Sequence, residues 1–189
     1  MPYLSILSSL IAREKTIFQL AVDGKCRKFV VYNLIILGIL FGLSNFIGTL
    51  STTSDLPLDG KFAIITPLAF CIAGFFIISC ALIGLILLYW SASQAFGGRG
   101  GFILIFDLIG LTLVPFWAIA PLLNYAINFN SSQIMTFILP VIIGVTGFWA
   151  FILTRDSLVA GQGLNQNKAT MAVLGIWIFS VSSVYVFLP

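Results

Sequence analysis

The most regular feature of the chain is a series of long apolar runs separated by short polar segments. Crossing a hydrocarbon core takes about 20 helical residues at a rise of about 1.5 Å per residue, and five runs meet this length. They cover residues 29–50, 62–90, 102–124, 134–153 and 169–187. In the second run, Thr66 before Pro67 predicts an N-cap followed by a first-turn proline, so this helix is expected over residues 66–90. The pattern predicts five transmembrane helices.

The apolar runs do not fit the patterns of other folds. Strands of a transmembrane β-barrel alternate apolar and polar residues over about ten positions, whereas residues 75–88 do not alternate. A soluble helical protein needs polar helix faces, but 60% of the residues are hydrophobic and only 8% are charged. We therefore predict an all-α, polytopic membrane bundle, with residues 29–189 forming one five-span membrane domain.

Residues 1–28 precede the first span and form a basic, amphipathic segment. Positive charge follows its apolar part instead of preceding it, so a cleavable signal peptide is not expected. A helix lying in the cytoplasmic interface is predicted, although a helix packed under the bundle explains the same pattern. The apolar residues that fall roughly along one side of this helix are Leu4, Leu7, Leu10, Ile11, Phe18 and Val22.

Cationic residues are distributed unevenly between the predicted loops. The chain has nine Lys and Arg residues, and all except Lys61 fall on one side of five alternating spans. Because cytoplasmic loops retain positive charge, this predicts a cytoplasmic amino terminus and an extracytoplasmic carboxyl terminus. The cations before the first span are expected to attract anionic lipid headgroups, although topology alone explains such a cluster. They are Arg13, Lys15, Lys25, Arg27 and Lys28.

The chain offers few groups for catalysis or metal binding. It contains no His, and its three Cys residues are scattered. Zinc, haem and copper sites of the common kinds need His or clustered thiolates, so no metal or cofactor is expected. The acids are also too few for paired acid–base work, so the protein is not expected to be an enzyme.

The most irregular cytoplasmic segment is Gly97-Gly98-Arg99-Gly100-Gly101-Phe102 between the second and third spans. It lacks the Lys-Ser/Thr ending and the preceding strand of a phosphate loop. It is also too short for an RNA-binding glycine–arginine repeat, so no nucleic acid partner is expected. Glycine accepts positive φ, which indicates a tight turn between antiparallel helices. The candidate positions in this turn are Gly97, Gly98, Arg99 and Gly101.

Asp107 is the only ionisable residue well inside a predicted span. Insertion of a carboxylate there costs about 2.5–3.5 kcal/mol, so an inward-facing, paired group is expected. The cations that the sequence offers as partners are Arg99, Arg155 and Lys168. A proton or ion relay would need several such groups, so we interpret Asp107 as structural.

Proline and glycine residues interrupt several of the predicted spans. Pro115 and Pro121 in the third span and Pro140 in the fourth predict kinks, because proline cannot donate the helical hydrogen bond. Such kinks either line a substrate site or fit a helix to its neighbours. Small residues three or four positions apart allow close helix packing, either within the bundle or between copies. The candidate helix-packing positions are Gly38, Gly42, Gly144 and Gly147.

The order of these features resembles the Yip (Ypt-interacting protein) family of five-span membrane proteins. The resemblance rests on the basic amino-terminal segment, the Gly97–Phe102 turn, Pro115 in the following span, and Gly163-Leu164-Asn165 before Lys168-Ala169. It implies a cytosolic amino terminus and a short carboxyl tail on the far side, and it supplies no catalytic residues. Eukaryotic members act in vesicle transport through longer cytosolic regions, so the short segment here points to a prokaryotic-type or organellar member.

Three classes of function stay open at this point. We expect a noncatalytic membrane organiser or accessory subunit that acts through lateral contacts with lipids, with other membrane proteins or with its own copies. The alternative is a small transporter or channel subunit. An intramembrane enzyme fits least well, because the chain has no His and few acids.

Overall fold

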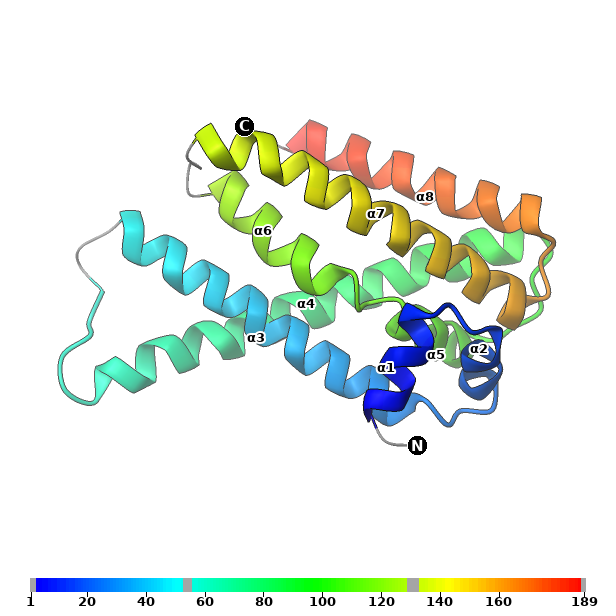
Figure 1. Ribbon diagram of the computed structural model, residues 1–189, viewed down its shortest axis with the longest axis horizontal. Coiled ribbons are helices and arrows are strands. Elements are labelled where there is room, and N and C mark those ends of the chain that lie inside the picture. The colour runs from blue at the N-terminus through cyan, green and yellow to red at the C-terminus, as the bar shows by residue number, and fades with distance from the viewer. Residues whose placement is uncertain (1–2, 53–55, 129–132, 188–189) are drawn as a thin grey trace. The chain divides into compact units, whose positions relative to one another are not determined.

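The computed structural model describes residues 3–52, 56–128 and 133–187. Helices are the only regular secondary structure in this part of the chain, which confirms the predicted all-α class (Figure 1). In chain order they are α1 (Tyr3–Ile11), α2 (Lys15–Val22), α3 (Arg27–Thr52), α4 (Phe62–Ala95), α5 (Phe102–Leu111), α6 (Phe116–Asn128), α7 (Gln133–Gln162) and α8 (Gln166–Phe187).

Three helical segments are long and apolar enough to cross a membrane. They are Arg27–Thr52, Phe62–Ala95 and Leu139–Gln162. The pair α5 and α6 passes the same test as one interrupted span, which raises the number of candidates in the described residues to four. The predicted fifth span corresponds to the 22-residue helix α8, which is not among these candidates. The chain is therefore a multi-pass membrane protein, and the count of five spans stays a prediction.

Helix α4 begins at Phe62, so the prediction that this helix starts at Thr66 was wrong. Pro67 lies in the second turn of the helix, where it removes only the hydrogen bond to the carbonyl of Ala63. The Thr66 hydroxyl does not cap the helix. It donates to the carbonyl of Pro57 at 2.8 Å, which holds the preceding segment against the first turns of α4.

The third predicted span is broken and not merely kinked. Helix α5 ends at Leu111 and α6 begins at Phe116, with turn residues between them. Pro115 explains the break, because its ring clashes with the carbonyl four residues earlier and disfavours helical geometry in the residue before it. The other two prolines, Pro121 and Pro140, lie inside α6 and α7, which continue through them.

The chain divides into two compact units that each combine distant segments. Unit 1 contains Met1–Val30, Ile83–Thr112 and Phe151–Pro189, and unit 2 contains Val31–Leu82 and Leu113–Ala150. Fully buried side chains in unit 1 include Leu10, Phe18, Ile86, Ile105, Leu108, Leu153 and Leu158. Buried apolar side chains in unit 2 include Leu37, Ile78, Leu82, Leu113 and Ile119.

The amino-terminal segment forms two short helices that meet at Arg13, where φ is +57°. This break changes the helical phase, so the apolar face predicted for a single helix is split. Leu10 and Phe18 are buried, whereas residues such as Leu4 and Ile11 are exposed. Helix α2 packs against α5 within unit 1, so the alternative of a helix packed against the bundle describes α2 better than a helix lying free in the interface (Figure 1).

Candidate functional site

Asp107 in α5 is buried in unit 1, with a side chain that is only 3% exposed. The guanidinium of Arg27, at the start of α3, contacts its carboxylate at two points. Nε donates to Oδ1 at 3.3 Å and Nη2 donates to Oδ2 at 3.0 Å. The predicted partners Arg99, Arg155 and Lys168 were therefore wrong. The available signal for Arg27 was its place next to the start of the first apolar run.

Two of the three cations that were expected near Asp107 make other contacts within unit 1, and the third is exposed. Arg155 donates twice to Oδ1 of Asp156, at 3.0 and 2.7 Å. The Lys168 ammonium donates to the carbonyl of Phe96 at 3.2 Å, and the Arg99 side chain is exposed. None of these contacts brings a second cation to Asp107.

Most of the amino-terminal cations pair with carboxylates. Arg13 contacts Asp156 at 3.1 Å, Lys25 contacts Asp23 at 3.0 Å, and Arg27 contacts Asp107. Lys28 is exposed, and the side chain of Lys15 lies outside the described part of the chain. The positive charge that this segment offers to lipid headgroups is therefore smaller than the number of its cations suggests.

Cys26 precedes Arg27 and is buried, with 1% of its surface exposed. Burial raises the pKa of its thiol, and the negative charge of Asp107 raises that pKa further. A thiol with a raised pKa stays protonated at neutral pH, so Cys26 is a poor nucleophile and a poor metal ligand. Across the described residues, no group of three or more His, Cys, Asp or Glu side chains is placed to hold a metal ion.

The glycine-rich turn between α4 and α5 is closed by Gln162, the last residue of α7, which is 2% exposed. Its side-chain Oε1 accepts a hydrogen bond from the Gly100 N–H at 2.9 Å, and its backbone carbonyl accepts one from the Arg99 N–H at 3.3 Å. The Gly98 N–H donates to the carbonyl of Ser93 at 2.7 Å. Because these N–H groups are used internally, the turn does not present them to a phosphate.

The turn needs glycine at two positions for space and at one for backbone conformation. A Cβ atom on Gly98 would lie 2.7 Å from Oε1 of Gln162, and one on Gly100 would overlap the same carboxamide. Gly97 has φ of +89°, which a residue with a side chain rarely adopts. Gly101, by contrast, has open space where a Cβ would be.

We expect Gly98→Ala to lower the unfolding midpoint in mild detergent by about 5 °C, while Gly101→Ala leaves it nearly unchanged. The reason is overpacking against Gln162, which typically costs about 1–3 kcal/mol, and each kcal/mol shifts the midpoint by about 2–4 °C in a chain of this size. Circular dichroism during heating measures both variants. Equal midpoints for the two variants would contradict a tight contact at Gln162.

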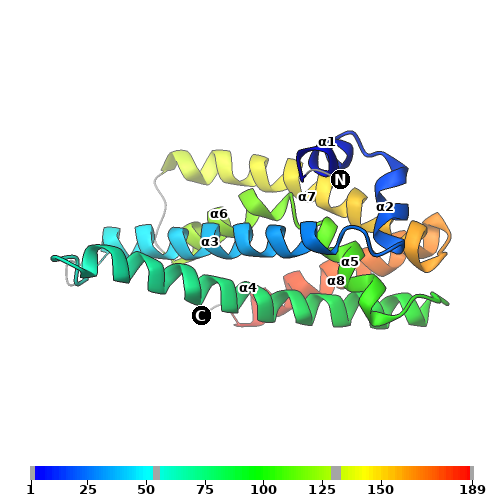
Figure 2. The same cartoon turned by 90° about the horizontal axis from the view of Figure 1, so that it is seen from below.

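The small-residue positions of α3 lie against α4 inside unit 2 (Figure 2). A Cβ on Gly38 would lie 2.6 Å from the Cα of Phe75, and one on Gly42 would lie 2.6 Å from the Cα of Cys71. A Cβ on Gly74 would lie 2.5 Å from the carbonyl oxygen of Gly38. The two backbones are therefore in direct contact, the geometry that small residues four positions apart permit.

The glycines of α7 are in a different environment. Gly147 is buried, but Gly144 is exposed and a Cβ added there would meet no atom within 4 Å. The neighbouring Val141, Val145 and Phe148 expose 65%, 67% and 67% of their surface. These residues define an outward face of unit 2, which we call the Gly144 face. The remaining candidate, Pro115, is buried in the turn before α6.

A polar contact within unit 2 was not predicted from the sequence. The Ser44 hydroxyl donates to the carbonyl of Pro121 at 2.8 Å, and the Asn124 amide donates to the Ser44 oxygen at 3.2 Å. The available signal was the presence of polar residues inside two apolar runs. Satisfying a polar group in lipid requires an internal partner, so these residues connect α3 and α6.

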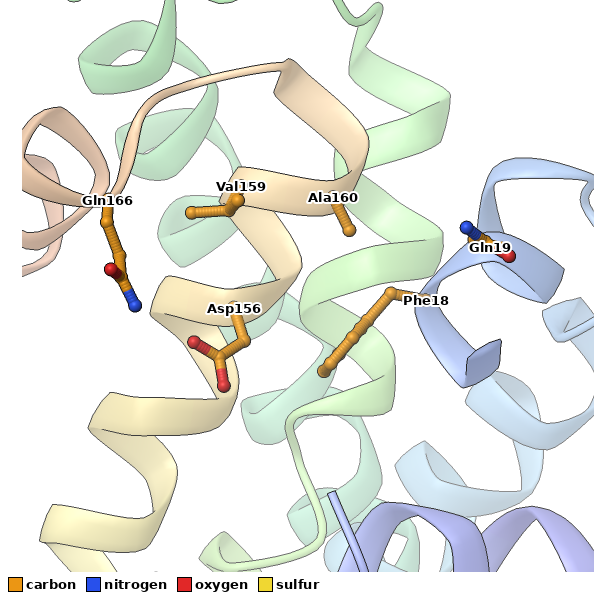
Figure 3. Close-up of a pocket in the computed structure, with 6 residues that line it drawn as sticks. All are labelled: Phe18, Gln19, Asp156, Val159, Ala160 and Gln166. Atoms are coloured by element: carbon orange, nitrogen blue, oxygen red, sulfur yellow. The ribbon is translucent and has the colours of Figure 1, made fainter. Parts of the chain in front are cut away.

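A cavity of about 440 Å³ lies within unit 1 (Figure 3). Phe18 and Gln19 of α2 line one side, and the opposite side comes from the end of α7 and the start of α8. In the close-up, Phe18 points from α2 towards the helix that carries Asp156. The full lining is Phe18, Gln19, Asp156, Val159, Ala160 and Gln166.

Comparison with known proteins gives one match. A family model described as the Yip1 domain matches residues 14–188, which is nearly the whole chain. Neither the curated proteins nor the solved structures gave a match.

Proposed function

The chain belongs to the Yip1 domain family of membrane proteins, and from this premise we propose that it is a noncatalytic membrane organiser or accessory subunit. The observation that carries the proposal is the two-point contact between Asp107 and Arg27. A transport relay needs an ionisable group that can exchange its proton or ion. In this protein the buried carboxylate is neutralised by a fixed partner, which is a structural use.

Lateral association is proposed at the Gly144 face. Lipid is as apolar as Val or Phe, so exposed apolar residues alone do not drive association. Close approach at a small residue does, and Gly144 has the open space that a second helix would fill. The glycines of α3 do not serve this purpose, because α4 already covers them.

The experiment is purification of the full chain in mild detergent, followed by native electrophoresis of the wild type and two variants. Gly144→Leu should abolish co-migration with a partner or a second copy, because a bulky side chain prevents close approach. Gly175→Leu is the matched control, since Gly175 of α8 also has open space around it. A wild-type protein that migrates as a monomer without any partner would refute the organiser proposal.

The transporter alternative has its own test. If Asp107 is structural, Asp107→Asn should lower thermal stability while the ion leak of reconstituted liposomes stays at the wild-type level. Fluorescent pH and potential indicators inside the liposomes measure this leak. Loss of a wild-type flux in a folded Asp107→Asn protein would favour transport over the organiser function.

We also propose a cytoplasmic amino terminus and an extracytoplasmic carboxyl terminus, supported by the position of Lys61 as the one cation in the opposite loops. A reporter enzyme fused after Pro189 should then be active on the extracytoplasmic side. The same reporter fused before α3 is the control and should signal from the cytoplasm. A cytoplasmic signal after Pro189 would mean an even number of spans.

A further inference from the structure

The cavity between α2 and α7 combines groups of three chemical kinds. Asp156 supplies a carboxylate, Gln19 and Gln166 supply amides, and Phe18 supplies an aromatic ring beside two small apolar residues. A volume of about 440 Å³ lies within the usual range of small-ligand sites, which is about 300–1,000 Å³. The lining therefore suits a compact ligand with one polar, positively charged end.

Asp156 has two cationic partners that differ in how firmly they are held. Arg155, the neighbouring residue, donates two hydrogen bonds to Oδ1 and its side chain is 22% exposed. Arg13 makes one contact to Oδ2 at 3.1 Å, and its side chain is 46% exposed. An exposed ion pair of this kind contributes about 0–1 kcal/mol, so a ligand can displace Arg13 from Oδ2 at little cost.

The position of the cavity indicates where its ligand comes from. Asp156 lies six residues before the end of α7 at Gln162, or about 9 Å along a helix that is a candidate span. This depth is close to the boundary between hydrocarbon and headgroups, since the apolar core is about 30 Å thick. A lipid headgroup beside the bundle is therefore within reach of the cavity.

We propose that this cavity binds the headgroup of an aminophospholipid, such as phosphatidylethanolamine. The primary ammonium donates to Oδ2 of Asp156 and lies near the ring of Phe18, which attracts cations. The phosphodiester binds the Arg13 guanidinium that the ammonium has displaced. The exchange keeps every charge paired, and it does not depend on the organiser function proposed above.

The same geometry disfavours other common headgroups. A choline headgroup carries a quaternary ammonium without N–H donors, so it cannot donate a hydrogen bond to Asp156. A glycerol headgroup has no ammonium at all, so it cannot take the place of Arg13 at Oδ2 of Asp156 and can only contact the Arg13 guanidinium through its phosphate. The expected order of affinity is ethanolamine above choline.

The first test measures lipid binding to the full chain in mild detergent by native mass spectrometry. Phosphatidylethanolamine should bind about tenfold more tightly than phosphatidylcholine, because a charge-assisted hydrogen bond is lost with choline. Lipids with one and two N-methyl groups should give intermediate affinities, decreasing as N–H donors are removed. Equal binding across this wild-type series would overturn the proposal without the use of any variant.

The second test uses Asp156→Asn, which keeps the shape of the side chain and removes its charge. We expect about a tenfold loss of phosphatidylethanolamine binding and little change for phosphatidylcholine. Asp23→Asn is the matched control, because Asp23 is an exposed carboxylate paired with Lys25 and does not line the cavity. An ethanolamine preference that survives in folded Asp156→Asn protein would overturn the proposal.

A third measurement separates a lipid from a free headgroup. Soluble glycerophosphoethanolamine carries the same ammonium and phosphodiester but no acyl chains. It should compete with phosphatidylethanolamine only at much higher concentration, because it lacks the acyl chains that hold the lipid against the apolar surface of the bundle. Equally tight binding of the soluble compound would assign the cavity to a metabolite and overturn its assignment to lipid.

Discussion

Gly42→Ala should cost about 3 kcal/mol of stability and lower the unfolding midpoint in mild detergent by about 10 °C. The added Cβ would overlap the backbone of α4, at the carbonyl of Phe70 and at the Cα of Cys71, where it would lie at 2.6 Å. A clash with backbone cannot be relieved by a change of rotamer, so α3 and α4 would have to move apart. Gly74→Ala should have a similar effect, because it faces the same contact from α4.

The matched control for this prediction is Gly84→Ala, also in α4. A Cβ at this position would meet no atom within 4 Å, and alanine favours a helix by about 1 kcal/mol over glycine. The midpoint should therefore stay the same or rise slightly. Circular dichroism and size-exclusion chromatography measure the three variants together. If Gly42→Ala and Gly84→Ala lower the unfolding midpoint by similar amounts, the loss comes from replacing any glycine and not from the contact between α3 and α4.

Arg27→Ala should destabilise the protein more than Asp107→Asn does, although both changes break the same ion pair. The two side chains differ in exposure, at 55% for Arg27 and 3% for Asp107. Removal of the Arg27 guanidinium leaves a buried carboxylate without its partner, whereas removal of the Asp107 charge leaves a guanidinium that can reach water. An uncompensated buried charge is the costlier of the two states.

For Asp107→Asn we expect the free energy of unfolding to fall by about 2 kcal/mol and the unfolding midpoint by about 5 °C. The loss is limited because the amide keeps part of the hydrogen bonding to Arg27. Arg27→Ala should lower the midpoint further, and Arg27→Lys should fall between them because it loses the two-point geometry. Arg99→Ala is the control, since this exposed side chain was the sequence-based candidate. If Asp107→Asn lowers the unfolding midpoint more than Arg27→Ala does, the difference in side-chain exposure does not decide which loss costs more stability.

The helices could be predicted because the length and hydropathy of a span are local properties of the sequence. The first apolar run, residues 29–50, lies within α3, and the fourth, residues 134–153, lies within α7. The start of α4 was misplaced because Thr66 and Pro67 match the pattern of an N-cap followed by a first-turn proline. In the folded chain the Thr66 hydroxyl instead donates a hydrogen bond to the carbonyl of Pro57. Local sequence could not reveal that contact.

The sequence was sufficient to identify candidate residues of the site, but not the residues that they contact. An isolated Asp107 in an apolar run implies a counter-charge, yet Arg27 is 80 residues away in the chain and follows a short segment that only the fold places against α5. The glycine-rich turn itself was predicted, but nothing in the sequence marks Gln162 as the group that packs against Gly98 and Gly100. The cavity was missed for the same reason, because α2 and α7 contribute to it from opposite parts of the chain.

The contact between Gln162 and the glycine-rich turn also sets an order of events during synthesis. Gly100 leaves the ribosome 62 residues before the glutamine that accepts its N–H. Translation adds about 5–20 residues per second, so Gln162 is synthesised roughly 3–12 s after Gly100. During that time the turn between α4 and α5 has only its local hydrogen bonds, such as the one from the Gly98 N–H to the carbonyl of Ser93. The arrival of the end of α7 fixes that turn, so the insertion of a late helix completes the structure of an earlier one.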